Sequence, residues 1–386
     1  MDPVRLAREV RRDTGDVVQF GRPTRPRPRW LGTVLLACLV GAAAIVVGTR
    51  LAGAGRLPPP SPTVTVTNAG HPILGIRGGY ELFGLDGSGV VRVQFARGRI
   101  VRTRLPPLQG DGIVSVVAAR GEVLVRPLDS VPGYAVPDGK PAKRLTGALA
   151  QGGILLPGPS SRQQWLAADY LALVGPGGKA EPAHLGPAVP AAPEQNVVPD
   201  GRGGLVLITT SGSVYDAGPG VLRPLNALLL AVGSRTWLGV ICTEGSCRPA
   251  VISAATGAGH ALPGTAVPTG SWLLNTLPGG PWPWQPLPGL TAPDGSTAAL
   301  IVPGQAAGRA SLELISLSSG AAVRVPVQVG HGSSSQSMAW SPDSRWLFVI
   351  TASGELAAVN PGTGQVHELG LGLSGLSQIV IRSASG

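Results

Sequence analysis

The chain has 386 residues, of which 43% are hydrophobic and 13% charged, and it contains 57 glycines and 38 prolines at a formal net charge of +10. The hydrophobic content argues against an intrinsically disordered chain. Eight arginines and four acidic residues lie within residues 1–30, and no dense basic stripe with interleaved aromatic residues follows them. The positive charge therefore does not indicate binding to nucleic acid.

The N-terminal part of the sequence predicts a cytoplasmic segment and a membrane anchor. Residues 1–29 are rich in Arg and Pro, and residues 31–49 carry no charge, which is long enough to cross a hydrocarbon core. Trp30 is favoured at a membrane interface, and the arginines before it favour a cytoplasmic N-terminus. We expect one transmembrane helix at residues 30–49, with the N-terminus inside. A signal peptide cleaved near residues 52–54 is the alternative.

A linker and an extracytoplasmic domain are expected after the anchor. Residues 50–70 contain the Pro- and Thr-rich stretch LPPPSPTVTVTNAG, which is typical of a stiff spacer. Residues 71–386 would then form the extracytoplasmic domain of a cell-membrane protein. Within it, Cys242 and Cys247 flank a Gly-containing turn, and an oxidising compartment favours a disulfide between them.

The sequence after residue 70 contains a degenerate repeat. VPDGRGGLVLITTSG, which ends at Gly212, matches SPDSRWLFVITASG, which ends at Gly354. The spacings from Gly121 to Gly212 and from Gly212 to Gly354 fit two and three units of about 46 residues. Each unit joins a Pro-Asp turn to a continuous apolar run, as in a strand buried on both faces. We therefore expect an all-β fold, a β-propeller of about seven four-stranded blades.

The last repeat also resembles a known family. The segment MAWSPDSRWLFVITASGELAAVNPGTGQVHELG resembles the WD40-like propeller repeats of the TolB and YVTN type, whose blades carry a W-S-P-D-G turn, an inner strand and a D-x-x-T-G turn. Residues 340–369 match this pattern well, and residues 197–225 and 291–327 match it in part. The resemblance implies a propeller but no particular activity, because propellers host many unrelated functions.

No motif for catalysis or metal binding accompanies the repeats. The sequence lacks G-x-S-x-G, G-x-x-x-x-G-K-S/T and H-E-x-x-H, and its five histidines are scattered singly. The acidic residues of the repeat turns, Asp200, Asp294 and Asp343, are expected to cap local backbone rather than to bind Ca²⁺. We therefore predict no catalytic residue, no metal site and no cofactor.

One stretch outside the repeats is rich in tryptophan. Trp272, Trp282 and Trp284 lie close together, and the last two stand between prolines. Such an extended segment displays its rings at a low entropic cost. The three residues are candidates for binding a sugar, a lipid headgroup or a peptide. The alternative is that their rings pack within the propeller.

Together these features predict a membrane-anchored extracytoplasmic propeller that acts as a non-catalytic binding or scaffold module of a bacterial cell envelope. Its partner would be an envelope protein or a glycan. Two other classes stay open. A propeller enzyme, such as a lyase or a glycan-acting hydrolase, needs convergent acid and base groups in the central channel. A transmembrane sensor would use residues 1–29 to report binding outside the cell.

Overall fold

The computed structural model describes the chain from residue 64 to residue 383, except at residues 69, 109–113, 128–131, 151–152, 169–170, 176–177, 183–194, 210–212, 219–220, 244–245, 265–288, 304–309 and 331–334. The described residues belong to one compact unit, Pro62–Gly386. None of their helices is long and apolar enough to cross a membrane. The expected transmembrane segment at residues 30–49 lies outside the described residues.

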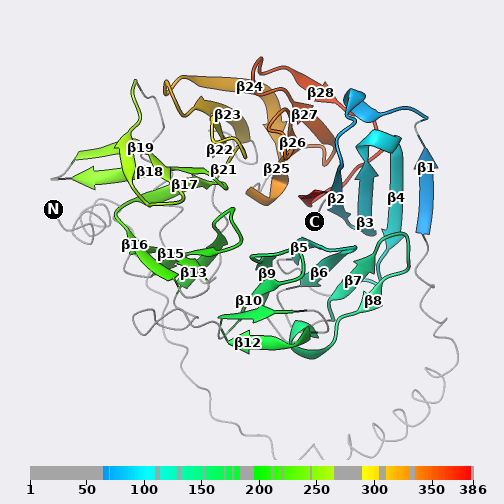
Figure 1. Ribbon diagram of the computed structural model, residues 1–386. Helices are drawn as coiled ribbons and strands as arrows, with labels where there is room; N and C mark the ends of the chain where they lie inside the picture. Colours follow the sequence, from blue (N-terminus) through cyan, green and yellow to red (C-terminus); the bar gives the residue numbers. More distant parts are fainter. Residues whose placement is uncertain are drawn as a thin grey trace, which may run out of the picture. The chain divides into compact units, whose positions relative to one another are not determined.

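The first and last strands of the described chain meet in a five-stranded sheet, here called the closing sheet. Its order is β1-β4-β3-β2-β29, and its strands are β1 (Val64–Asn68), β2 (Tyr80–Asp86), β3 (Gly89–Gln94), β4 (Arg99–Arg104) and β29 (Gln378–Ser383). The final strand, β29, pairs antiparallel with β2, and this pairing closes the ring of sheets (Figure 1).

Strand β1 extends the closing sheet at its outer edge, where it pairs antiparallel with β4. Residues 64–68, which were expected to belong to the linker at residues 50–70, form this strand. The reason is that these residues read VTVTN, and β-branched side chains favour an extended strand wherever a sheet edge is available.

Four further sheets have four strands each, which follow chain order from the innermost strand outward. The first two contain β5 (Val114–Ala119), β6 (Glu122–Pro127), β7 (Tyr134–Pro137) and β8 (Lys143–Arg144), then β9 (Ile154–Pro157), β10 (Gln164–Ala167), β11 (Leu171–Val174) and β12 (Ala180–Pro182). The other two contain β13 (Gln195–Pro199), β14 (Leu205–Thr209), β15 (Val214–Gly218) and β16 (Val221–Leu225), then β25 (Met338–Trp340), β26 (Leu347–Ile350), β27 (Leu356–Val359) and β28 (Val366–Glu368). Short 3-10 helices occur at η1 (Ile73–Gly75), η2 (Phe95–Arg97), η3 (Gly147–Ala150) and η5 (Ser335–Ser337).

The remaining sheet has eight strands, and it corrects the expected blade count. It contains the antiparallel halves β17 (Leu228–Val232), β18 (Thr236–Thr243), β19 (Ser246–Ser253) and β20 (Gly259–Ala261), and β21 (Gly289–Thr291), β22 (Thr297–Pro303), β23 (Ala310–Ser316) and β24 (Ala322–Val329). The halves join because the innermost strands β17 and β21 lie close enough to pair in parallel, Ala231 with Gly289 and Val232 with Leu290. The described strands therefore form five separate blades and one eight-stranded sheet rather than seven separate four-stranded blades.

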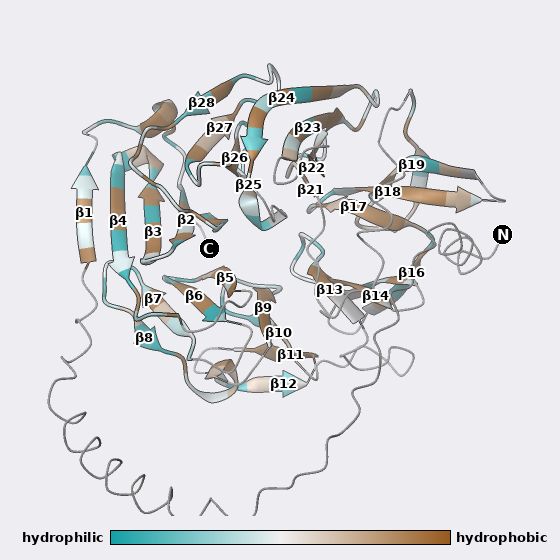
Figure 2. Ribbon diagram, turned by 180° about the vertical axis from the view of Figure 1, so that it is seen from behind, coloured by the Kyte–Doolittle hydropathy of each residue, from teal (hydrophilic) through white to brown (hydrophobic). Residues whose placement is uncertain are grey.

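Hydrophobic clusters between successive sheets form the core. Phe95 of η2, which joins β3 to β4, stacks on Phe348 of β26 at 4.7 Å between ring centroids, and Trp165 of β10 shares a buried cluster with Leu205 of β14. In Figure 2, strands such as β18 and β27 are coloured mainly as hydrophobic. Burial on both faces of the sheets explains why the apolar runs in the sequence are continuous rather than alternating.

The loops that lead from the innermost strand of a sheet to its second strand lie at one edge of the sheets. We call them the first corners, and they comprise residues 120–121, 158–163, 200–204, 233–235, 292–296 and 341–346. In the closing sheet, residues 70–79 precede β2 at the same edge and are counted with the first corners. Successive corners are joined by hydrogen bonds from Arg120 N to Ser161 O (2.8 Å), Trp165 Nε1 to Gly203 O (2.8 Å), Trp237 Nε1 to Asp200 O (3.0 Å), Thr236 Oγ1 to Gly295 O (3.2 Å) and Asp294 N to Ser344 Oγ (3.0 Å).

Trp237 provides a test of this corner packing, because its ring is fully buried and its indole N–H also lies 3.1 Å from Gly233 O. We expect Trp237→Ala to lower the free energy of unfolding by about 3–5 kcal/mol, as for other large-to-small core changes. Trp237→Phe keeps a ring but loses the hydrogen bonds, and it should cost about 1–3 kcal/mol. The measurement is urea denaturation followed by fluorescence. Trp346→Ala, at a partly exposed ring, is the control, and an equal loss there would contradict the expectation.

Candidate functional site

The innermost strands are where a propeller enzyme would carry convergent acid and base groups. They are β5, β9, β13, β17, β21, β25 and β29. The side chains described on these strands include one charged residue, Arg382, and no Asp, Glu, His, Lys, Cys or Tyr. A general acid and a general base must both reach the reacting group, and the described part of these strands supplies neither.

Arg382 instead belongs to an ionic network that ties the closing sheet to the next one. Its Nη2 donates to Glu81 Oε2 at 2.8 Å and to Asp138 Oδ2 at 2.6 Å. Glu81 also accepts hydrogen bonds from Arg92 Nε at 3.0 Å, Arg92 Nη2 at 2.7 Å and Gln94 Nε2 at 2.8 Å. The carboxylate is therefore occupied on both oxygens, which suits a structural lock rather than a reactive group.

The ionic network also controls the protonation of Glu81. Burial alone would raise its pKa, but the hydrogen bonds from Arg92 and Gln94 outweigh burial and place the pKa below its ordinary value. Glu122, at the start of β6, shows the opposite balance: burial raises its pKa, and the charge of Lys143 only partly opposes this. Glu81 therefore stays ionised and accepts hydrogen bonds down to acidic pH.

A second buried carboxylate, Asp216 on β15, is also held by arginines. Arg202 Nη2 lies 3.0 Å from its Oδ2, and Arg223 Nη2 donates to the same oxygen. Arg223 Nη1 also donates to Ala255 O at 2.8 Å. This cluster fastens β15 and β16 to the β19–β20 turn. Since both arginines carry these bonds, a structural role accounts for Asp216.

The aspartates of the repeat turns hold local backbone, as the Pro-Asp pattern predicts. Burial raises the pKa of Asp200, and a hydrogen bond from the Arg202 backbone and the charge of the Arg202 guanidinium oppose this rise. Asp200 Oδ1 accepts hydrogen bonds from Arg202 N (2.6 Å) and Gly204 N (2.8 Å). Asp294 Oδ1 accepts one from Ser296 N (2.9 Å), and Asp343 Oδ1 accepts one from Ser341 Oγ (2.6 Å). Among the described residues, no group of three or more His, Cys, Asp or Glu could hold a metal ion.

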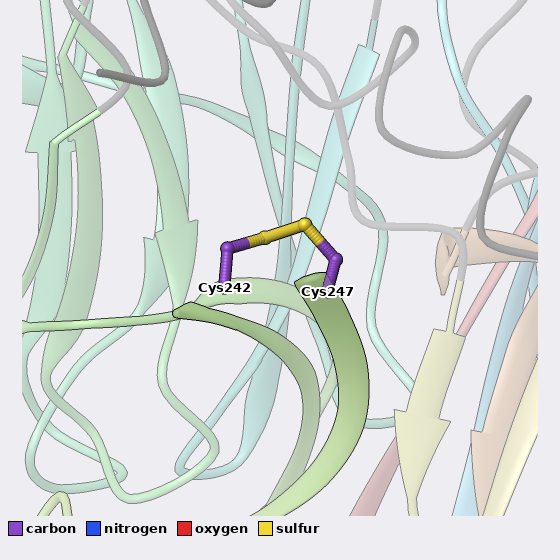
Figure 3. The surroundings of a disulfide bond; sticks show 2 residues. All are labelled: Cys242 and Cys247. Carbon is purple, nitrogen blue, oxygen red and sulfur yellow. A yellow bond between two sulfur atoms is a disulfide. The ribbon is translucent and has the colours of Figure 1, made fainter. Parts of the chain in front are cut away.

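The predicted site residues fall in two different places. Cys242 and Cys247 face each other across the β18–β19 hairpin and are joined by a disulfide, with their Cα atoms 4.0 Å apart (Figure 3). Trp272, Trp282 and Trp284 lie outside the described residues, in the connection between β20 and β21.

Sequence reasoning missed a group of exposed arginines at the first corners. They are Arg77, Arg120, Arg162, Arg202, Arg235 and Arg345. A signal was available, because Arg202 and Arg345 hold the same place in the two matched Pro-Asp turns. The other four lie in turns without that motif, so only the strand order brings all six to one edge. This edge, which we call the arginine face, is the candidate binding surface.

Comparisons with known proteins identify no family for this chain. No protein-family profile matches the sequence, and no curated protein matches it. Among solved structures, TolB from Acinetobacter baumannii is similar at 11% identity and a TM-score of 0.40, over 80% of this chain and 83% of TolB.

Two other solved structures are similar at the same low level. Hydrazine synthase from Kuenenia stuttgartiensis has 10% identity and a TM-score of 0.39, over 66% of this chain and 78% of that one. A puromycin-hydrolysing peptidase from Mycobacterium tuberculosis has 14% identity and a TM-score of 0.43, over 83% of this chain and 57% of that one. At these scores the likenesses carry no argument, and the fold rests on the strand pairing described above.

The lowered pKa of Glu81 predicts a pH-dependent contribution to stability. Because its folded-state pKa lies below the unfolded value, the contribution is present above that unfolded value and is lost as the pH falls through the folded one. We expect Glu81→Gln to lower the free energy of unfolding by about 1–3 kcal/mol at neutral pH, with the difference from wild type shrinking towards pH 3. Urea denaturation across this range measures it.

The matched control is Glu313→Gln. Glu313 lies 3.5 Å from Arg324, whose side chain is 69% exposed, so its pair should contribute less than about 1 kcal/mol. A pH-independent effect of Glu81→Gln, or an equal effect of the control, would contradict the role assigned to the network.

Proposed function

We propose that this chain is a membrane-anchored, extracytoplasmic β-propeller that serves as a non-catalytic binding or scaffold module of the cell envelope. The observation that carries the proposal is the chemistry of the innermost strands, whose described side chains hold one charged residue, Arg382. That residue is committed to Glu81 and Asp138. The buried carboxylates are likewise committed to arginines or to turn backbone, which leaves rigid strands that present loops.

The anchor is proposed from the sequence that precedes the described residues. Strand β1 begins the described chain, and it runs along the outermost edge of the closing sheet. A ring of sheets provides a rigid platform on which loops can bind partners. The apolar segment at residues 30–49, with arginines before it, supports the anchor and its orientation.

The anchor predicts a defined topology in intact cells. Protease added outside should remove everything after about residue 55, and an epitope tag at the N-terminus should stay protected with a short fragment. Immunoblotting of shaved cells against the tag measures this. A soluble, tag-free domain released to the medium would indicate cleavage of a signal peptide instead. Full protection of the domain would contradict the proposed location.

The tryptophan segment supplies the test of binding. We expect the full-length chain carrying Trp282→Ala and Trp284→Ala to lose crosslinks to envelope material while its melting temperature stays within about 2 °C of wild type, because exposed rings contribute contact area without supporting the core. In-cell crosslinking followed by purification measures the first quantity. Unchanged crosslinking with lowered thermal stability would mean that these rings pack within the propeller.

A further inference from the structure

The arginine face is a group of charged side chains, most of which take no part in the ionic networks of the described residues. Its arginines come from the closing sheet, the three sheets that follow it, the first half of the eight-stranded sheet and the last four-stranded sheet. We propose that this face binds an extended polyanion, a polymer that carries a phosphate group in each repeat. The inference rests on the proposed function, because it names the chemical class of the partner.

Most of these arginines are available to a ligand. Within the described part of the chain, no ion pair involves Arg77, Arg120, Arg162 or Arg235, and all four are exposed. Arg345 is 81% exposed, and its Nε lies 4.0 Å from Asp343 Oδ2. A pair at that distance on the surface holds a guanidinium weakly. Of the six, Arg202 alone is committed to buried carboxylates.

The acidic residues at the same edge do not cancel this charge. The first corners contain three aspartates, Asp200, Asp294 and Asp343, against the six arginines. Asp138, which follows β7 at the same edge, is paired with Arg92 and Arg382. Each aspartate accepts a hydrogen bond from a residue of its own turn, as described above, and Asp200 is buried. The arginine side chains therefore extend to solvent while the carboxylates stay close to the backbone.

The opposite edge of the sheets lacks such a group. Its connections run from the outermost strand of one sheet to the innermost strand of the next and from second to third strands. In the described residues of those connections, Glu355 is the single charged side chain. The asymmetry argues against a basic surface spread evenly by an arginine-rich composition. The charge is concentrated where the sheet topology brings six separate turns together.

The arrangement fits a polymer better than one small anion. A guanidinium presents parallel N–H groups that match two phosphate oxygens. Here each arginine comes from a different corner, and successive corners contact one another through the hydrogen bonds given above. A chain of phosphates lying along the edge can therefore meet several guanidiniums in turn, and linked weak contacts add up to avidity.

Strand β1 runs towards the edge that carries the arginine face. Val64 pairs with Thr103 at the end of β4, and Asn68 pairs with Arg99 at its start. The described chain thus begins at the edge opposite the arginine face. Single-stranded nucleic acids are bound through stacking on aromatic rings, and the described first corners contain one such ring, Trp346, which packs edge-on against His367.

Binding of poly(glycerol phosphate) to the full-length chain in zwitterionic nanodiscs tests the proposal. We expect saturable binding that weakens at least about tenfold between about 50 and 200 mM salt, because several phosphates are neutralised. Arg120→Glu, Arg162→Glu and Arg235→Glu together should weaken it by about 100-fold or more, since reversal adds repulsion. Dextran, a neutral polymer, should not bind.

The matched control reverses three exposed arginines elsewhere, Arg104, Arg144 and Arg248, and so makes the same change in net charge. It should keep binding within about threefold. Thermal melting checks that both variants fold. If the first triple variant does not fold, the same three positions changed to Gln replace it, with an expected loss of about tenfold. Equal losses in the two triple variants would overturn the proposal.

Further outcomes separate this inference from the proposed function. No binding of poly(glycerol phosphate) at low salt overturns the inference, as does arginine-dependent binding to phosphatidylglycerol vesicles in place of the polymer. If an envelope protein is crosslinked equally by wild type and by the first triple variant while the polymer does not bind, the inference fails and the proposed function stands. Polymer binding without any capture in cells would leave the inference supported and the proposed function contradicted.

Discussion

The pairing of β29 with β2 is the interaction on which the rest of the structure depends. It places the last strand at the inner edge of a sheet whose other strands come from the start of the described chain. The clusters on both faces of that sheet, which include Phe348 on one side and Val123 on the other, are covered only when the sheet is complete. The ionic network around Glu81 and Arg382 secures the same pairing with charge-assisted hydrogen bonds.

The first corners combine two roles in a few residues. In three of the corners aspartate oxygens accept backbone N–H groups and hold the turn, while buried tryptophans such as Trp165 donate to the neighbouring corner. Arginines in the same turns extend outward. The aspartates and tryptophans therefore hold the turns in place, and the arginines are the side chains that face solvent. Because the turns are fixed by these internal bonds, an anionic partner meets guanidiniums that need little reorganisation of the backbone.

The sequence was informative wherever the cause of structure is local. Pro-Asp turns and continuous apolar runs led to an all-β propeller, and the strand pairing confirms that fold class. The parallel pairing of β17 with β21 and the bond between Glu81 and Arg382, 301 residues apart, leave no local pattern. VTVTN at residues 64–68 reads equally as a spacer or a strand until a partner edge exists. The six arginines read as ordinary solvated charges, because only the topology brings their turns to one edge.

The position of β29 has a further consequence for biogenesis. A chain that emerges N-terminus first exposes β2 long before its partner strand is made, since Glu81 of β2 and Arg382 of β29 lie 301 residues apart. Contacts of such long sequence separation form late and slowly. Until then, the flanks of the incomplete sheet present apolar surface of the kind that aggregates or recruits chaperones. The ring therefore cannot close before its last strand is made, and a chain that lacks β29 leaves β2 without its partner.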